Sequence, residues 1–168
     1  MESSVKLLGH PAHQMLVMVP VGLLVTSVVF DAAYHLADSP LMASSAYHVI
    51  VVGILGGLLA APFGLLDWMK IPTGTRARRV GALHGLGNVV VLALFGASAV
   101  MRMDAPQSPE GLAQVLSLAG VLLAGVTAWL GGELVDRLGV GVSDGAGLNA
   151  PSSLRGDARP QPSTAGGR

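Results

Sequence analysis

The residues most able to do chemistry in this sequence are a few histidines, carboxylates and one asparagine that border or lie within long apolar runs. Ionisable groups are costly in lipid unless they are paired or hydrated, so each needs a partner or a role. By position along the runs they form two groups. The cytoplasmic-end group, named for the orientation derived below, comprises His10, His13, Asp67, His84, Asn88 and Glu133. The outer-end group comprises Asp31, His35 and His48.

The cytoplasmic-end group contains three histidines that could act as nitrogen ligands. His10 and His13 stand three positions apart and share a helix face, provided the helix begins before Pro11. Together with His84 they would form a metal site with three nitrogens, or His13 and His84 would hold a b-type haem across a bundle. In either case the remaining polar side chains would orient the ligands or handle protons. These supporting groups are Asp67, Asn88 and Glu133.

The outer-end group offers a weaker version of the same chemistry. Asp31 and His35 are four positions apart, so a carboxylate-oriented imidazole is a candidate arrangement. A second haem would use His35 and His48. His13 and His35 are about 22 positions, or roughly 33 Å of helix, apart, so direct electron transfer between two such centres would be slow. The simpler interpretation is that these side chains reach into the headgroup region.

The elements that must position these residues are four apolar runs. The chain has 168 residues, 51% of them hydrophobic and only 12% charged, with a mean hydropathy of +0.61. This composition excludes an ordinary soluble domain. The runs predict an all-α, integral membrane four-helix bundle. The predicted spans cover about 13–37, 45–68, 79–102 and 110–135.

The same composition excludes several classes of function. The formal net charge is 0 and no basic stripe with interleaved aromatic residues is present, so we expect no nucleic-acid partner. Cysteine is absent, which excludes disulfides, thiolate metal sites and cysteine-held iron–sulfur clusters in this chain. The sequence contains no nucleophile elbow, and no dinucleotide-binding glycine motif follows a strand. We therefore expect no independent catalytic activity.

Domain boundaries follow from composition. We predict a cytoplasmic N-terminal segment over 1–12, a transmembrane domain over 13–138 and a disordered cytoplasmic tail over 139–168, where Gly, Pro, Ser, Asp and Arg dominate. Within the first span, Pro20 removes a backbone donor and predicts a kink. In the second, Gly53 and Gly57 predict the close approach of another helix.

The distribution of cations predicts orientation. With four spans, the two termini share a side with the connector between the second and third spans. That side holds nine of the ten cations, namely Lys6, Lys70, Arg76, Arg78, Arg79, Arg137, Arg155, Arg159 and Arg168. Only Arg102 lies on the other side. We therefore expect a multi-pass protein of the bacterial inner membrane with both termini in the cytoplasm.

Several motifs resemble a bacterial four-helix membrane family catalogued as a domain of unknown function, number 2231. They are HPAHQMLVMVPVGLLV from residue 10, FD at 30–31, GLLDW at 64–68, RRVGALHGLGN at 78–88 and GGELVDRLGVGV at 131–142. The likeness covers nearly everything except the tail and implies a four-helix transmembrane domain. Members of that family occur fused or adjacent to Rieske iron–sulfur and other redox modules, which implies a role in membrane electron transfer.

Carried over by position, the family pattern falls on members of both polar groups: His10, His13, Asp31, Asp67, His84, Asn88 and Glu133. His35 and His48 lie outside it. The sequence departs from the pattern at four positions: Gln14 replaces a usual proline, Met18 a histidine of some members, Asp136 a tyrosine and Leu138 a histidine. The missing histidine weakens a metal site at the cytoplasmic end.

Two interpretations stay open. The first is a redox subunit that binds haem b or a His-ligated metal through the cytoplasmic-end group and exchanges electrons with a redox protein or a quinone. The second is a structural or transport-accessory membrane protein in which the same residues form a buried hydrogen-bond network and no cofactor binds. The oligomeric state is open in both.

Overall fold

The protein is a bundle of four long helical segments, as predicted. The computed structural model describes residues 1–155. Four segments in it are long and apolar enough to cross a membrane: Ala12–Ala37, Pro40–Lys70, Arg76–Arg102 and Gly111–Arg137. The helices within them are α1 (Ala12–Leu16), α2 (Met18–Ala37), α3 (Pro40–Lys70), α4 (Arg76–Arg102), α5 (Gly111–Gly132) and the π-helix η1 (Glu133–Arg137).

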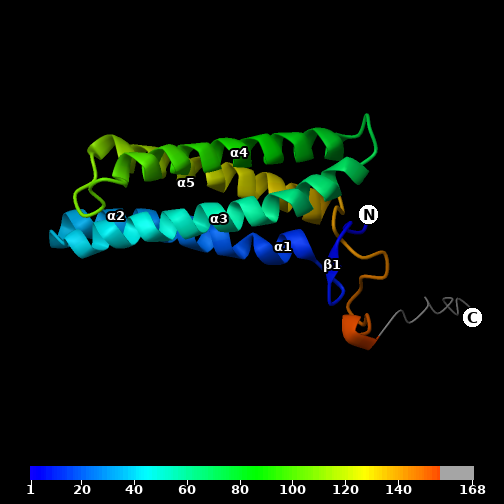
Figure 1. Ribbon diagram of the computed structural model, residues 1–168. Helices are drawn as coiled ribbons and strands as arrows, with labels where there is room; N and C mark the ends of the chain where they lie inside the picture. Colours follow the sequence, from blue (N-terminus) through cyan, green and yellow to red (C-terminus); the bar gives the residue numbers. More distant parts are fainter. Residues whose placement is uncertain (156–168) are drawn as a thin grey trace, which may run out of the picture.

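Short elements flank the bundle at the end where the chain begins (Figure 1). The strands β1 (Lys6–Leu7) and β2 (His10–Pro11) form a small antiparallel hairpin directly before α1. A short 3₁₀-helix, η2 (Ser153–Arg155), follows the bundle. The tail predicted over 139–168 is described only as far as residue 155, so its remainder lies outside the described residues.

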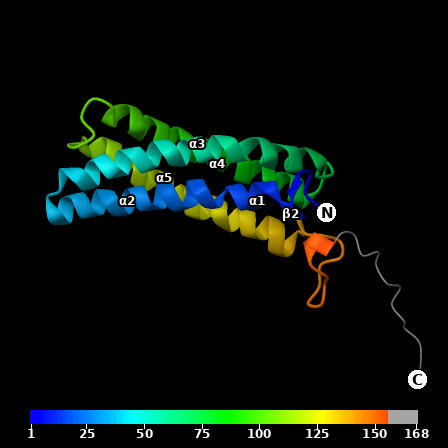
Figure 2. The same ribbon diagram turned by 60° about the horizontal axis from the view of Figure 1, so that its bottom comes forward.

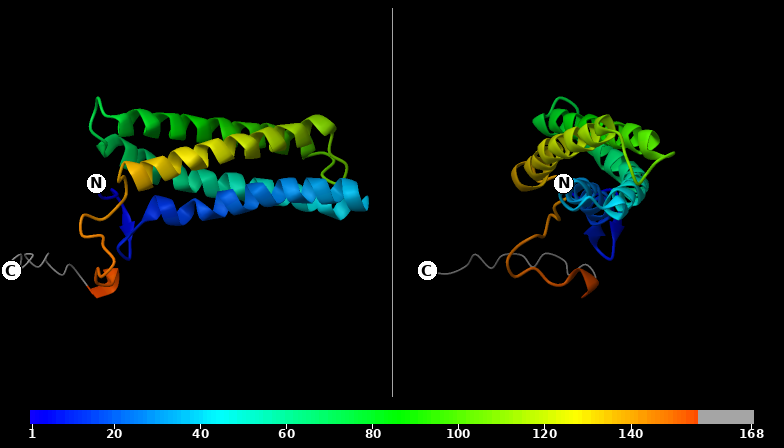
Figure 3. Two further views of the ribbon diagram at one scale, coloured as in Figure 1. Left: turned by 180° about the vertical axis from the view of Figure 1, so that it is seen from behind. Right: turned by 90° about the vertical axis from the view of Figure 1, so that its left-hand side faces the viewer.

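The bundle consists of two antiparallel helical hairpins laid side by side. α2 packs most closely on α3, and α4 most closely on α5, with smaller contacts of α3 with α4 and of α2 with α5. Figure 2 shows α2 and α3 running together, and both views in Figure 3 show the α4–α5 pair lying against them. Any side chain that joins the two hairpins therefore acts across the weaker interface of the bundle.

The second span begins earlier than the sequence suggested. α3 starts at Pro40 rather than near residue 45, because proline is favoured in the first helical turn and Ser39 supplies the extended residue before it. The connection between α2 and α3 is correspondingly short, and Asp38 adopts a left-handed conformation there, with φ of 48°. α4 begins with a side-chain cap, because Oγ1 of Thr75 accepts a hydrogen bond from the amide of Arg78 at 3.1 Å.

The first span is interrupted just before Pro20. α1 ends at Leu16 and α2 begins at Met18, with Val17 in a turn between them. Proline cannot donate to the carbonyl four residues earlier, which here belongs to Leu16, and its ring crowds that carbonyl. The interruption therefore falls at the turn that Pro20 leaves without its hydrogen bond.

Small residues allow neighbouring helices to pack closely, both within the first hairpin and between the two hairpins. A Cβ atom added at Gly53 would lie 2.7 Å from Leu24, and one added at Gly57 would lie 2.7 Å from Leu92. The predicted close approach at these two glycines is therefore present. The central core is apolar and is formed by Leu24, Ile50, Val91, Phe95 and Ala99, with Tyr47 and others packed around it.

The outer surface of the bundle is strongly apolar. Val100 and Leu122 are 67% and 66% exposed, and many other large aliphatic side chains share this exposure. In water such a surface would drive aggregation, whereas in a bilayer it is the surface that contacts acyl chains. Each of the four segments contains an 18-residue stretch with a mean hydropathy between 1.8 and 2.4.

Candidate functional site

The most deeply buried charges in the protein form an ion pair at the outer end of the bundle. The guanidinium of Arg102 on α4 donates to both carboxylate oxygens of Asp31 on α2, at 2.7 Å each. The side chain of Arg102 is 0% exposed and that of Asp31 is 7% exposed. This fork geometry is the strongest form of a carboxylate–cation contact. Because α2 and α4 belong to different hairpins, the pair joins them.

Two serines complete the surroundings of this guanidinium. Nε of Arg102 donates to Oγ of Ser98, at 3.1 Å, and one terminal nitrogen also donates to Oγ of Ser117, at 3.2 Å. The two hydroxyls lie 2.8 Å apart, and Ser98 contacts the carbonyl of Ala113 on α5 at 2.7 Å. Both serines are fully buried. We call Asp31, Ser98, Arg102 and Ser117 the outer polar cluster.

Asp31 does not orient His35, although the two share a helix face. The Asp31 carboxylate turns inward to Arg102, and the ring Nε2 of His35 is hydrogen-bonded instead to Oε1 of Gln114 on α5. His35 is exposed and lies beside a groove between α2 and α5. His48 is also exposed, and its Nδ1 contacts the carbonyl of Ser44 on its own helix, at 2.7 Å. The outer-end residues therefore separate into three different environments.

A second polar network, formed by His84, Asn88 and Thr127, lies between α4 and α5, toward the end of the bundle where the chain begins. Nδ1 of His84 is 2.8 Å from the carbonyl oxygen of Thr127, and Nε2 of His84 is 3.2 Å from the side-chain amide of Asn88. Oδ1 of Asn88 accepts from the Thr127 hydroxyl, at 3.0 Å. If Nδ1 of His84 carries the proton, each of these three hydrogen bonds joins a donor to an acceptor. The pairing of His84 with Asn88 agrees with their spacing of four.

His13 lies on the first hairpin and is held in a similar way. Its Nδ1 is 3.0 Å from the carbonyl oxygen of Ala60 on α3. Gly64 makes this approach available, because a Cβ atom there would lie 2.7 Å from the His13 ring. The two imidazoles thus belong to different hairpins, and each has Nδ1 fixed on a backbone carbonyl.

The third histidine of the predicted metal site lies elsewhere. His10 is exposed on β2, and its Nδ1 contacts the carbonyl of Leu8 at 3.2 Å. The helix begins after Pro11 rather than before it, so the three-residue spacing to His13 does not place both rings on one helix face. Among residues 1–155, no group of three or more His, Cys, Asp or Glu side chains is arranged to hold a metal.

Asp67 is bound by the N-terminal segment rather than by a histidine. Oγ of Ser3 donates to its carboxylate at 2.8–2.9 Å, and the amide of Ser4 donates to the same group. The segment before the bundle is therefore folded onto the end of α3. Further along, the amide of Gly141 donates to the carbonyl of Met1 at 2.9 Å, so the start of the tail joins this cap.

One titratable group of this cap has a shifted pKa. The pKa of Glu2 is lowered, first because Nζ of Lys6 donates to its carboxylate at 2.7 Å and also because the amide of Asp144 does so at 3.3 Å. Both contacts favour the charged form. Because the pKa falls on folding, their stabilisation is present at neutral pH and is lost as the pH drops through the folded-state pKa.

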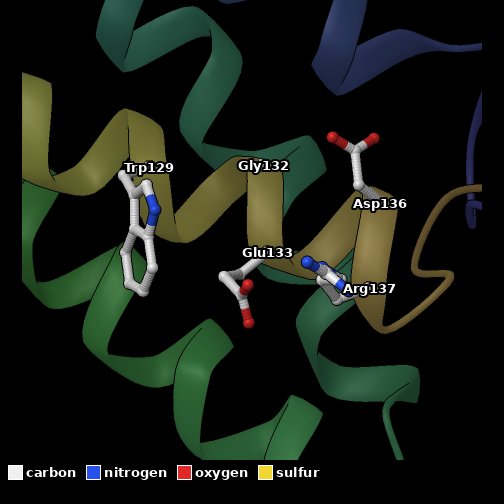
Figure 4. Close-up of a pocket in the computed structure, with 5 residues that line it drawn as sticks. All are labelled: Trp129, Gly132, Glu133, Asp136 and Arg137. Carbon is white, nitrogen blue, oxygen red and sulfur yellow. The ribbon is translucent and has the colours of Figure 1, made fainter.

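Glu133 forms an ion pair at the surface. Its carboxylate lies 2.7 Å from a guanidinium nitrogen of Arg76, at the start of α4. Glu133 also borders a shallow hollow of about 270 Å³, and Figure 4 shows the carboxylates of Glu133 and Asp136 pointing away from each other. The π-helix at this point carries the two carboxylates on different sides. The carboxylates of Glu133 and Asp67 are thus each bound to groups other than the two imidazoles.

Reasoning from the sequence missed the main feature of the outer end. Arg102 was counted only as the one cation on its side, yet it is the partner of the one acidic residue within the first span. An indication was available, because two opposite charges at the same depth in lipid are expected to pair. For Ser98, Ser117 and Gln114 the sequence carried no comparable indication, since these side chains are uncharged and nothing in their spacing names a partner.

Comparison with known proteins gives one match. A family model described as a predicted membrane protein, DUF2231, matches residues 9–144. The match includes all four membrane-spanning segments and the start of the tail. No curated protein and no solved structure matches the chain.

Proposed function

Because the chain belongs to the DUF2231 family of predicted membrane proteins, a description that names no activity, we propose a role from its geometry: an accessory membrane subunit without catalytic activity of its own. In this role the protein presents a fixed four-helix surface to the bilayer and to partner proteins. Its polar residues hold the two helical hairpins in one arrangement.

One observation carries this proposal. Within residues 1–155, every buried side-chain nitrogen and oxygen has a hydrogen-bond partner in the protein. In the outer polar cluster, both Nε and the terminal nitrogens of Arg102 donate hydrogen bonds. In the network of His84, Asn88 and Thr127, both ring nitrogens of His84 are hydrogen-bonded. Polar groups that satisfy one another favour a unique helix packing, because any other packing would leave some of them unpaired in lipid.

A redox role is the second candidate, and the orientation of two imidazoles favours it. His13 and His84 each direct Nδ1 at a backbone carbonyl, the arrangement that fixes the tautomer of histidines whose Nε2 binds a metal. A b-type haem or a His-ligated metal held by this pair would supply one-electron chemistry, with a redox protein or a quinone as the exchange partner.

The residues fit this second candidate only in part. Nε2 of His13 has no hydrogen bond within residues 1–155, whereas Nε2 of His84 accepts one from Asn88. Ligation by His84 therefore requires the Asn88 amide to turn away. Asp67 and Glu133, which would support the ligands, are bound to the N-terminal segment and to Arg76. Because these hydrogen bonds and ion pairs would compete with ligation, the geometry favours the accessory role.

Absorption spectra of the purified protein separate the two candidates. For the accessory role we expect a reduced-minus-oxidised spectrum without haem bands and less than about 0.1 metal ion per chain. A sharp α-band, or one metal per chain, would overturn the accessory role in favour of the redox role. Both measurements use the full chain in detergent, purified after expression with added haem precursor and metal salts.

Two variants sharpen this test. In the accessory role, His84→Ala and Asn88→Leu each break the same network and each lower stability, by about 1–3 kcal/mol. In the redox role, His84→Ala loses the absorption band, while Asn88→Leu retains it because Nε2 of His84 is then free. Unfolding in detergent, followed by circular dichroism, measures the first effect.

We propose the same orientation as the sequence predicted, with both termini in the cytoplasm. The ends of α3 and α4 that meet at their connector carry four cations, namely Lys70, Arg76, Arg78 and Arg79. The loop over 103–110 carries only the acidic residues Asp104 and Glu110. Arg102, the single cation counted against this orientation, is fully buried and paired with Asp31. Positive charge therefore gathers on the side of the termini, which favours the cytoplasm.

Thiol labelling tests the orientation. The chain has no cysteine, so Thr73→Cys and Ala105→Cys each introduce a single thiol, one in each connector. In intact bacterial cells we expect a membrane-impermeant maleimide to label Ala105→Cys within minutes and Thr73→Cys only after permeabilisation. The reverse pattern would show that the termini lie outside.

A further inference from the structure

We propose that the hairpin of β1 and β2 is an interfacial anchor whose tip is inserted among the lipids of the leaflet beside which the hairpin lies. The tip consists of Leu7, the last residue of β1, and Leu8, the first residue of the turn. Their side chains are 56% and 70% exposed. We call these two residues the leucine tip. The proposal goes beyond the accessory role and holds whichever side of the membrane that leaflet faces.

The backbone of the turn makes leucine an unfavourable residue there in water. Leu7 pairs with His10, so Leu8 and Gly9 form a two-residue turn, and both have positive φ, of 51° and 83°. Turns of this kind favour asparagine, aspartate or glycine, because other residues are strained at positive φ. Leu8 therefore combines a strained backbone with an exposed apolar side chain. Burial among lipids offsets both costs, because an apolar side chain gains free energy on leaving water.

The hairpin lies at the depth of the lipid headgroups. Just before it, Oγ of Ser3 and the amide of Ser4 donate to the carboxylate of Asp67, near the end of α3. The next residue, Trp68, is of the type that gathers at membrane interfaces. At its other end the hairpin leads directly into α1, where the first membrane-spanning segment begins. Both ends of the hairpin are therefore fixed at the boundary of the apolar helices.

The hairpin points sideways rather than along the bundle. In Figure 1 it extends away from the axis of the helices, next to the start of α1, and both views in Figure 3 show the same direction. A hairpin that continued along the axis would carry its tip into water. One that runs sideways at this depth lies along the membrane surface, so its tip meets the lipids beside the bundle.

The polar groups beside the leucine tip already have partners. Nζ of Lys6 lies 2.7 Å from the carboxylate of Glu2, and Nδ1 of His10 lies 3.2 Å from the carbonyl oxygen of Leu8. Insertion of the tip therefore costs little in lost hydration of these groups. The turn is also supported from the tail, because a Cβ atom added at Gly9 would lie 2.6 Å from the side chain of Ser153 on η2.

A lipid surface fits this tip better than a protein partner does. Stable protein interfaces bury about 800 Å² on each partner, which is several times the surface that two leucine side chains present. Contact with lipid needs no such minimum area, because the membrane-spanning helices already hold the hairpin at the bilayer. The leucine tip then adds one more contact, which fixes the folded N-terminal segment against the membrane surface.

Quenching of a fluorophore at the tip tests the proposal. The chain has no cysteine, so Leu7→Cys accepts a single NBD maleimide in the full-length protein, reconstituted as one copy per phosphatidylcholine nanodisc. We expect lipids with a nitroxide near the top of the acyl chain to reduce the emission by at least about half, and aqueous iodide to have little effect. Labelled Met18→Cys and Thr73→Cys, on the exposed surface of α2 and in the α3–α4 connector, mark the lipid and water limits.

Changes at Leu8 in the labelled Leu7→Cys protein test whether the apolar side chain is the anchor. Leu8→Asn keeps the turn, because asparagine tolerates positive φ, and should weaken quenching by lipid at least about twofold. Leu8→Met is the matched control and should leave the quenching unchanged, while circular dichroism checks that both variants keep their helices. The proposal is wrong if the two variants are quenched equally, or if iodide quenches the label at position 7 as strongly as the one at position 73. Protection from both quenchers would also overturn it, since it would place the tip against protein.

Discussion

Replacing Arg102 with methionine is expected to lower the free energy of unfolding by about 3–5 kcal/mol, because the Asp31 carboxylate is then left buried without its partner. Asp31→Leu should have a similar effect, since it leaves an uncompensated guanidinium. The double variant should be more stable than either single one, because two apolar side chains of similar size need no partner in lipid. Equilibrium unfolding in mixed micelles measures all three.

The decisive quantity is the coupling energy between the two substitutions, obtained from the double-mutant cycle. A coupling energy above about 2 kcal/mol would establish that the two side chains stabilise the bundle as a pair. Arg79→Met serves as the matched control, because Arg79 is exposed on α4 and should change stability by no more than about 0.5 kcal/mol. Additive effects of the two single changes would contradict the pairing.

Gly120→Ala should destabilise the second hairpin although alanine is the better helix former. A Cβ atom at Gly120 would lie 2.7 and 2.9 Å from two ring carbons of Phe95, which is fully buried. Overpacking of this kind costs about 1–3 kcal/mol. Gly125 on the same helix has nothing within 4 Å of its added Cβ, so Gly125→Ala should be neutral or stabilise by up to about 1 kcal/mol.

A compensating change checks the cause. Phe95→Leu in the Gly120→Ala background should recover part of the lost stability, because the smaller side chain makes room for the new methyl group. Equal effects of alanine at Gly120 and at Gly125, measured by the same unfolding experiment, would rule out a tight contact at Phe95.

The four-helix fold could be predicted because its cause is local. Each span is a run of apolar residues longer than the hydrocarbon core, and such a run has few alternatives in lipid. The early start of α3 was missed because the residues before the apolar run, from Pro40 onward, are only moderately apolar, while proline at the first turn extends the helix. Whether a helix forms depends mainly on its apolar run, whereas the residue at which it begins depends on such details of the turn.

The polar contacts could not be predicted in the same way, because they depend on how each helix is rotated about its axis. A spacing of four suggested that Asp31 orients His35, but the spacing does not decide between a local partner and one on another helix. Two charge-assisted bonds from Arg102 outweigh one bond from an imidazole. The spacing of His84 and Asn88 did identify neighbours, since no charge competes for either one.

The N-terminal segment forms contacts with the end of the bundle that composition did not indicate. Residues 1–12 were predicted only as a cytoplasmic segment, yet Ser3 and Ser4 bind Asp67. This contact removes one carboxylate from the expected cluster of ligands. Ser3 and Ser4 reach the Asp67 carboxylate because the segment before the bundle folds back onto the end of α3.

The division of the outer ion pair between the two hairpins bears on how the chain is made. The ribosome delivers the first hairpin, with its acidic residue, before the second hairpin and its arginine exist. At that stage the nascent chain carries an acidic residue in the membrane without its cationic partner, which is costly. Completion of the second hairpin supplies the partner, so the acidic residue is matched only once both hairpins are in place.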